Sequence, residues 1–196
     1  MVFKILSFIF LGGIVAASIY VLKNPTSIYS LAPKKPRSPS TNATAPSSPG
    51  ILQVTASINL YFADPESDFL MVEPRTVTWK VDDLRDQMRV VIQELIKGPQ
   101  GTLVQTIPPH TIIRGLTVEK GWLGIVDFSG ELSRNHPGGS SAEIQTIYSI
   151  VNSLVLNLPS LKQIKILVEG DSLDTLKGHI DCRGPFEANL SVIKSG

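Results

Sequence analysis

The sequence predicts an α+β domain in which a mixed sheet carries two helices packed on one face, preceded by one N-terminal transmembrane helix. Three observations lead to this prediction: two stretches with apolar residues at helical spacing, several short strand-like stretches, and an uncharged apolar run near the N-terminus. The predicted parts are an N-tail (1–4), a transmembrane helix or uncleaved signal anchor (5–22), a Pro/Ser/Thr-rich linker (23–54), a globular domain (55–188) and a C-terminal tail (189–196).

The N-terminal run ILSFIFLGGIVAASIYVL lies between Lys4 and Lys23 and contains no charge. A helix of this length spans roughly 27 Å at about 1.5 Å per residue, close to the hydrocarbon thickness of a bilayer. The alternative is a signal peptide cleaved after Ser18, but the apolar run continues past that point, which favours a retained anchor. Residues 33–50 are rich in Pro and Ser and have little to bury, so they are expected to form an extended spacer.

Charge is distributed unevenly along the chain. Residues 1–50 carry five basic and no acidic residues, whereas residues 51–196 carry 13 basic and 17 acidic residues, a net charge of −4. A mildly acidic domain lacks the basic surface that neutralises phosphates, so nucleic acid is not an expected partner. The single Cys excludes an intrachain disulfide framework and any multi-cysteine metal site, and no cofactor is expected.

The first half of the domain reads as two strands, a helix and a hairpin. Residues 55–63 alternate between apolar and polar side chains, and residues 69–77 are extended, with Pro74 confining that strand to an edge or ending it. Asp82-Asp83 is expected to cap a helix that Gly98-Pro99 ends. Two strands at 112–118 and 122–128 then form a hairpin.

The second half begins with a helix whose start is marked by Ser140 and Glu143, the pattern of a capping box. Apolar residues continue at steps of three and four until Pro159 ends the helix. A short apolar strand at 164–168 and a last strand at 176–182 complete the predicted order ββαββαββ.

Candidate chemical groups form no coherent active site. His110, His136 and His179 occur in no metal-binding frame, and the serines before the second helix are explained by its cap. Cys182 is expected to be a small core or strand residue. The alternative to a non-catalytic function is a cell-wall-active hydrolase that uses carboxylates at strand ends; the candidates are Asp127 and Glu169, with Glu131, Asp171 and Asp174 near them.

The order of motifs resembles the GerMN domain family, the sporulation and spore-germination domain of GerM-type proteins. The resemblance rests on LYFADPESDFLMVEPRTV in the first strands, VVIQELIKGP at the end of the first helix, and TIPPHTIIRGLTVEKGWLGIVDFSGEL across the hairpin. It continues through GGSSAEIQTIYSIVNSLVLNLPSLKQIKILVEGD and TLKGHIDCRGPF, and covers roughly two thirds of the chain.

This resemblance implies a non-catalytic domain, related to ring-building modules, that lies outside the cytoplasm and is tied to the cell envelope. The family supplies no catalytic motif, so no catalytic residues carry over. The expected location is the bacterial cytoplasmic membrane, crossed once by residues 5–22. The expected partners are envelope proteins or peptidoglycan, with self-association also open. GerM-type spore proteins are similar to a lipoprotein with tandem domains, whereas this sequence shows one domain and a plain helix anchor.

The three hypotheses of function predict different kinds of surface. An assembly module should show an exposed apolar patch or an open strand edge. A hydrolase should show a concave pocket with a strongly perturbed carboxylate. A wall-binding module should show a shallow groove with exposed aromatic residues, for which Trp79 and Trp122 are the candidates.

Overall fold

The computed structural model describes residues 52–194. The predicted transmembrane helix at 5–22 and nearly all of the linker therefore lie outside the described residues. Within residues 52–194, no helix is both long enough and apolar enough to cross a membrane.

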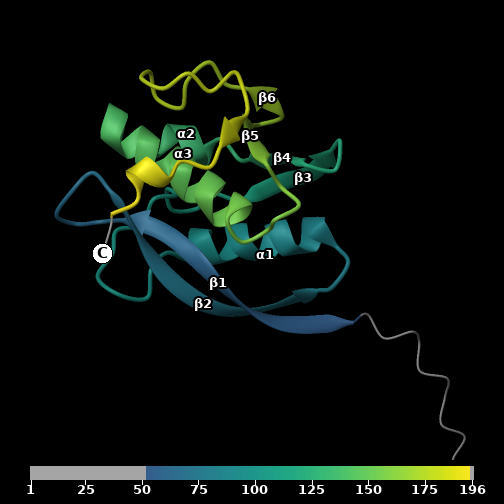
Figure 1. The fold of residues 1–196 in the computed structure, drawn as a ribbon. Coiled ribbons are helices and arrows are strands. Elements are labelled where there is room, and N and C mark those ends of the chain that lie inside the picture. Colours follow the sequence, from purple (N-terminus) through teal and green to yellow (C-terminus); the bar gives the residue numbers. More distant parts are fainter. Residues whose placement is uncertain (1–51, 195–196) are drawn as a thin grey trace, which may run out of the picture. The chain divides into compact units, whose positions relative to one another are not determined.

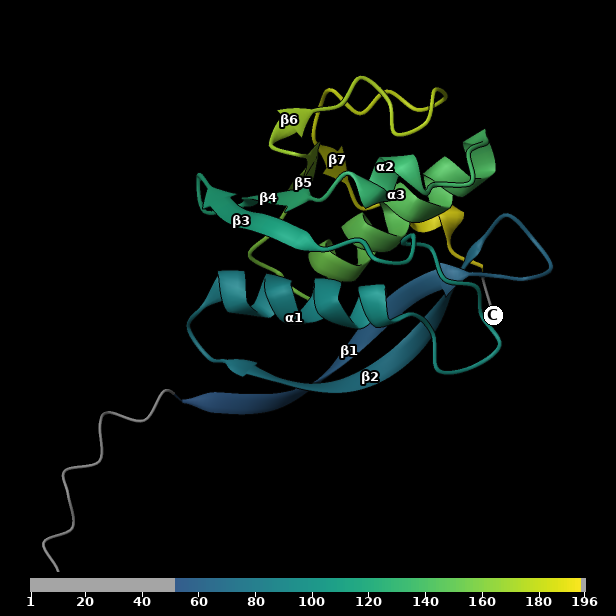
Figure 2. The same ribbon diagram turned by 180° about the vertical axis from the view of Figure 1, so that it is seen from behind.

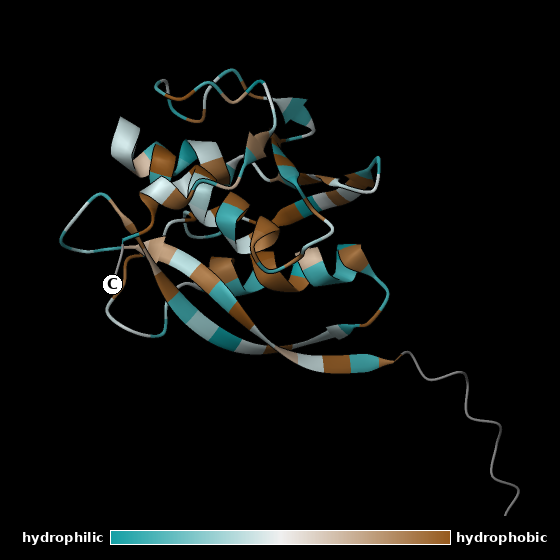
Figure 3. Cartoon of the chain, in the orientation of Figure 1, coloured by the Kyte–Doolittle hydropathy of each residue, from teal (hydrophilic) through white to brown (hydrophobic). Residues whose placement is uncertain are grey.

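The described chain begins with an antiparallel hairpin of β1 (Gln53–Ala63) and β2 (Leu70–Lys80). Hydropathy alternates along both strands, as Figure 3 shows, because neighbouring side chains point to opposite faces. One face buries Ile58, Leu60 and Phe62. Pro74 lies within β2 rather than at its end; among the described strands β2 pairs with β1 alone, so Pro74 lies on an edge strand, as predicted.

Helix α1 (Leu84–Lys97) follows, with the predicted caps at both ends. The Asp83 side chain accepts a hydrogen bond from the N–H of Asp86, and the N–H of Gly98 donates to the carbonyl of Leu95. Gly98 has a φ of 83°, a conformation that glycine adopts without strain. Both caps are local, and the sequence pattern identified them correctly.

A mixed sheet forms the second half of the domain. β3 (Ile113–Glu119) pairs antiparallel with β4 (Leu123–Phe128), and β4 pairs parallel with β5 (Gln163–Val168). The remaining elements are α2 (Glu131–Arg134), α3 (Ser140–Val155), β6 (Asp171–Ser172), β7 (Phe186–Glu187) and the 3-10 helix η1 (Leu190–Val192). The two short strands β6 and β7 both pair antiparallel with β5.

The helices lie between the hairpin and the mixed sheet. Figures 1 and 2 show α1 and α3 between the β1–β2 hairpin on one side and β3, β4 and β5 on the other. The mixed sheet and its two helices were predicted, but the prediction that the first two strands join that sheet was wrong. Side chains of Ser153 and Asn157 occupy part of the outer edge of β1, so that stretch cannot pair with another strand.

The core lies between these layers. It includes Phe62 of the hairpin, Met88 of α1, Ile147 of α3 and Phe128 of the sheet, all essentially inaccessible to solvent. Gly124 allows close packing there, because a Cβ at this position would lie 3.0 Å from Met88 Cε. Residues Ser47–Gly196 form one compact unit that contains the whole core, so this unit is expected to fold on its own.

Two local predictions are corrected by the structure. The predicted capping box is absent: Gly139 is the N-cap residue of α3, and no side chain caps the helix. The Glu143 side chain instead accepts bonds from residues 177–180, which a local pattern could not reveal. The predicted strand at 176–182 is also wrong, since this stretch is a loop with one isolated bridge between Thr175 and Asp181.

Candidate functional site

The two carboxylates predicted at strand ends do lie close together. Asp127 ends β4 and Glu169 follows β5, and Arg114 of β3 contacts both: its Nε lies 3.7 Å from Asp127 Oδ2, and its Nη1 pairs with Glu169 Oε2. The Gly170 N–H donates to Asp127 at 2.9 Å, and the Gly130 N–H donates to Glu169 at 2.6 Å. The carboxylates therefore act as acceptors that fix two turns.

This arrangement lacks the asymmetry that glycoside hydrolysis needs. A glycosidase requires one carboxyl group that holds a proton and a second that is ionised. Here one guanidinium contacts both groups, and a main-chain N–H group donates to an oxygen of each. Glu131 is held as an anion, because hydrogen bonds from Ser129 and Arg134 lower its pKa to about 2.

Glu143 is the most completely buried charged side chain of the domain, with no solvent exposure. Its Oε2 accepts hydrogen bonds from the main-chain N–H groups of Lys177, His179 and Ile180, and its Oε1 lies 2.7 Å from His179 Nδ1. Burial raises the pKa of Glu143, but these hydrogen bonds lower it by more, so the pKa falls below its ordinary value. Glu143 thus anchors the long loop before β7 to α3.

A small cavity of about 250 Å³ lies between the end of β1 and α3, next to a chain of buried polar groups. The His136 Nδ1 accepts from the Gly138 N–H, so its Nε2 carries the proton and donates to Thr146 Oγ1 at 3.0 Å. Thr146 in turn donates to the carbonyl of Thr106. Burial lowers the pKa of His136, in keeping with a neutral ring. Every hydrogen-bond donor in this series of buried polar groups has a partner within the fold.

The other candidate groups do not converge. Among residues 52–194, no group of three or more His, Cys, Asp or Glu side chains is placed to hold a metal ion. Burial raises the pKa of the Cys182 thiol to about 11, which keeps it protonated and unreactive. Trp79 is buried in the core, and Trp122 is partly buried beneath Lys120 Nζ, 5.5 Å from its ring centre.

A groove runs along α1 beside the edge of the mixed sheet. It consists of three neighbouring hollows of about 490, 250 and 590 Å³; the first two share the lining residue Arg89, and the last two share Asp83 and Arg85. We call it the α1–β3 groove. Its lining from the β3 side comprises Thr111, Ile112, Ile113, Leu116, Thr117 and Val118.

One wall of the α1–β3 groove is a strand edge. Among the described strands β3 pairs only with β4, so every second residue of β3 turns its main-chain N–H and C=O away from the sheet. Figure 2 shows α1 running beside this strand. Such an edge can accept an added strand from another chain.

The opposite wall carries two arginines that have no ion-pair partner among the described residues, and at its N-terminal end the carboxylates of Asp82, Asp83 and Asp86. Arg85, Arg89 and Gln93 recur every four residues on α1 and face the groove. Arg85 and Arg89 are exposed and form no ion pair with any residue in 52–194. At one end Ile96, Ile112 and Ile113 give the groove an apolar floor, and Ile112 is 60% exposed.

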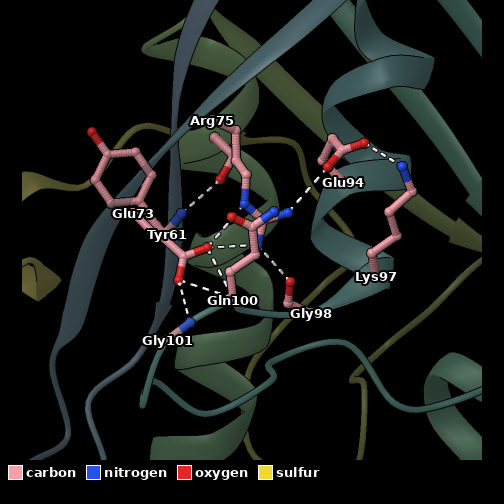
Figure 4. A network of polar contacts seen from close by, with 9 residues as sticks. Tyr61, Glu73, Arg75, Glu94, Lys97, Gly98, Gln100 and Gly101 are labelled. Carbon is pink, nitrogen blue, oxygen red and sulfur yellow. Dashed lines mark hydrogen bonds and ion pairs between the residues drawn. The ribbon is translucent and has the colours of Figure 1, made fainter.

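A buried ion network holds the C-terminal end of α1 against β2 (Figure 4). The Arg75 guanidinium donates to Glu73 Oε1, to Glu94 Oε2 at 3.0 Å and to the carbonyl of Gly98 at 2.7 Å. Glu73 also accepts from the N–H groups of Gln100 and Gly101. Burial raises the pKa of Glu73, but the bonds from Arg75 and these N–H groups lower it by a larger amount, so the pKa falls below its ordinary value. The network fixes the helix that forms a wall of the groove.

The sequence patterns did not predict the α1–β3 groove. The signal that could have found it is the pair Arg85 and Arg89, which stand one helical turn apart on the same side of the helix. Such a like-charged pair costs a few tenths of a kcal/mol in a helix.

Comparison with known proteins identifies the domain type. The family model described as Germane, sporulation and spore germination, matches residues 59–174, more than half of the chain. None of the proteins with curated descriptions matches the chain.

Three solved structures are similar in fold to this chain. A candidate lipoprotein from Clostridium perfringens is 25% identical with a TM-score of 0.50; the match covers 69% of this chain and 87% of that one. The tandem GerMN domains of the sporulation protein GerM from Bacillus subtilis are 16% identical, with a TM-score of 0.49 and coverage of 72% and 46%, so the chain spans less than half of the tandem protein. The first GerMN domain of that protein alone is 17% identical, with a TM-score of 0.48 and coverage of 69% and 98%.

Proposed function

The chain belongs to the Germane family of sporulation and spore germination domains, and we propose that it is a non-catalytic protein-binding module of the bacterial cell envelope. The α1–β3 groove carries this proposal, because it is where the domain leaves both main-chain hydrogen-bonding groups and side-chain charge without partners among residues 52–194. The family description names cellular processes and no reaction.

We place the domain outside the cytoplasm, held at the cytoplasmic membrane by residues 5–22. The uncharged apolar run and the Pro/Ser-rich spacer support this location. The similar structure from Clostridium perfringens is described as a candidate lipoprotein, a class of protein held at a membrane surface by a lipid. A membrane-held domain on a spacer can reach partners in the space beyond the membrane.

The partner that fits the groove is an extended segment of another envelope protein. Such a segment would add to β3 as a further strand and satisfy the main-chain groups that β3 turns away from β4. The groove is open along its length, so an extended chain can lie in it without displacing α1.

The charge of the groove selects an acidic segment. Carboxylates placed between Arg85 and Arg89 would replace a repulsion with two ion pairs, and an apolar side chain would cover Ile96, Ile112 and Ile113. Because alternate side chains of a strand point to opposite faces, the partner is expected to turn one face to α1, with acidic residues toward Arg85 and Arg89 and an apolar residue toward Ile96.

The test is a titration of residues Ser47–Gly196 with a blocked synthetic peptide that carries two aspartates and one valine on the same face of its strand, monitored through the amide NMR signals of the domain. We expect shifts confined to α1 and β3, and at least tenfold weaker binding for the Arg85→Glu/Arg89→Glu variant. Lys165→Glu is the single-site control, since Lys165 is a basic residue on β5 away from the groove, and it should change the affinity less than twofold.

Two further arms separate the alternatives. Peptides N-methylated at one or the other set of alternate amides should bind unequally, because only one set faces β3; equal binding would contradict strand addition. Co-sedimentation of the unmodified domain with peptidoglycan sacculi would support wall binding instead. Release of muropeptides that Asp127→Asn abolishes would establish a hydrolase.

A further inference from the structure

The outer edge of β1 is divided into a covered half and an open half. In the covered half, the Asn157 side-chain amide bonds the N–H of Asn59 at 2.8 Å and its C=O at 2.7 Å, as a neighbouring strand would. Further along, Ser153 accepts from the N–H of Tyr61, and Val104 bonds both main-chain groups of Ala63. These partners leave no room for another strand beyond Asn59.

The open half comprises the main-chain groups of Gln53, Thr55 and Ser57. The N–H of Val81 donates to the carbonyl of Leu52 at 3.0 Å, which shows that even-numbered residues of β1 face β2. Odd-numbered residues therefore face the free edge. No residue in 52–194 bonds the main-chain groups of these three on that side. This stretch contains no proline, no charge and no bulge, the devices that normally protect an edge.

From this edge we propose that β1 pairs antiparallel with β1 of a second copy of this chain, about a two-fold axis at Thr55. The open stretch is symmetric for such pairing: Thr55 would bond Thr55 of the second copy, and Gln53 would bond Ser57 in both directions. Each of the three residues would donate one main-chain bond and accept one. Asn157, on the Asn59 position, stops the pairing at the next step.

The side chains of the open stretch suit a second copy. Gln53, Thr55 and Ser57 lie on one face and carry no charge, so identical strands meet without repulsion. On the opposite face Leu52 and Val54 are 76% and 43% exposed, and pairing would place Leu52 opposite Ile58 and Val54 opposite Ala56 of the second copy. A partner strand with charged side chains would meet no side chain of opposite charge on this edge.

The pairing joins two hairpins into one four-stranded sheet, β2–β1–β1–β2. An interface of a few residues per chain is small, so we expect a weak dimer in solution that gains strength when both copies are held on one membrane. No residue of the open β1 edge lines the α1–β3 groove, so this inference stands independently of the proposed function.

The test compares cross-linking of two single-cysteine additions to residues Ser47–Gly196 at millimolar concentration. Thr55→Cys places thiols across the two-fold axis, where paired residues lie about 5.5 Å apart and can form a disulfide. Thr78→Cys is the control, because Thr78 is the exposed neighbour of Thr55 on β2 but lies one strand further from the axis. The native Cys182 is buried and stays inert.

We expect a cross-linked dimer for Thr55→Cys at least tenfold more abundant than for Thr78→Cys. Thr55→Pro removes the central outward donor without removing a bond to β2, an arrangement that Pro74 already shows on β2. This variant should be monomeric by sedimentation equilibrium with an unchanged melting temperature. A wild-type domain that is monomeric at millimolar concentration, or a dimer that persists in Thr55→Pro, would overturn the proposal. So would protection of the amides of Gln53, Thr55 and Ser57 in a monomeric full chain, since its own preceding segment would then occupy the edge.

Discussion

The strand ends around Asp127 and Glu169 and the α1–β3 groove both present charged side chains, but they differ in how far those charges are already paired. At the strand ends Arg114 and two main-chain N–H groups satisfy both carboxylates. In the groove, Arg85 and Arg89 and the edge of β3 have no partner within residues 52–194. The comparison indicates that polar groups with partners inside the domain hold the fold together, whereas polar groups without such partners are available for binding.

The largest effect on stability is expected at Glu143, the buried carboxylate that accepts several hydrogen bonds within the fold. Glu143→Ala should lower the free energy of unfolding by about 3 kcal/mol or more, because it leaves buried N–H groups of the 177–180 loop without an acceptor. Chemical denaturation of Ser47–Gly196 measures this. A loss below about 1 kcal/mol would show that the loop is not held by Glu143 and would weaken the comparison.

The buried His136 ring, which also has its hydrogen-bond partners within the fold, should make stability depend on pH. His136 is buried and neutral with a lowered pKa, so below pH 6.5 the unfolded chain binds a proton that the folded chain does not. Stability should therefore fall as the pH drops below 6.5, by at most about 1.4 kcal/mol per pH unit from this group. His136→Asn should flatten the profile between about pH 7 and pH 5. An identical slope in both proteins would mean that His136 does not remain neutral in the folded domain.

Smaller losses are expected at the strand ends. Asp127→Asn and Glu169→Gln should each cost about 1 kcal/mol, since each weakens a partly exposed pair with Arg114 and one bond to a turn. Thermal unfolding checks the size of the loss. If either change left stability unaltered while abolishing muropeptide release by the full chain, these carboxylates would be catalytic and the contrast with the groove would fail.

The smallest effect on stability belongs to the groove. Arg85→Glu and Arg89→Glu should each change the free energy of unfolding by less than about 0.5 kcal/mol, because neither side chain has an ion-pair partner to lose within the described residues. Thermal unfolding and peptide titration of the same samples give stability and affinity side by side. A large loss of stability would show that these arginines belong to the fold rather than to a binding surface.

The sequence predicted what local chemistry determines. Asp83 and Gly98 bound α1 as expected, since each cap bonds residues of the same helix. The proximity of Asp127 and Glu169 followed from two strands ending at one edge of a sheet, and the structure confirms it. Their role did not follow, because it depends on Arg114, which reaches them only through the register of β3 against β4.

The failures share a cause in long-range contacts. Ser140 and Glu143 matched a capping box, but the partners of Glu143 lie more than thirty residues away in a loop that the sequence presented as a strand. The hairpin β1–β2 was assigned to the main sheet because strand patterns carry no information on which sheet a strand joins. Both errors arose where tertiary contacts override a plausible local pattern.

The central claim, that the α1–β3 groove binds an extended segment of another protein, is tested most directly in the membrane of the bacterium that makes the chain. The full chain would carry a photo-cross-linking residue at Gln93 in the groove or, as a control, at Lys165 on β5. The account predicts that Gln93 cross-links to one segment of an envelope protein, that mass spectrometry finds acidic residues and an apolar residue at alternate positions of that segment, and that Arg85→Glu/Arg89→Glu abolishes the product. Cross-links from Gln93 to glycan strands, or an equal pattern from both positions, would contradict it.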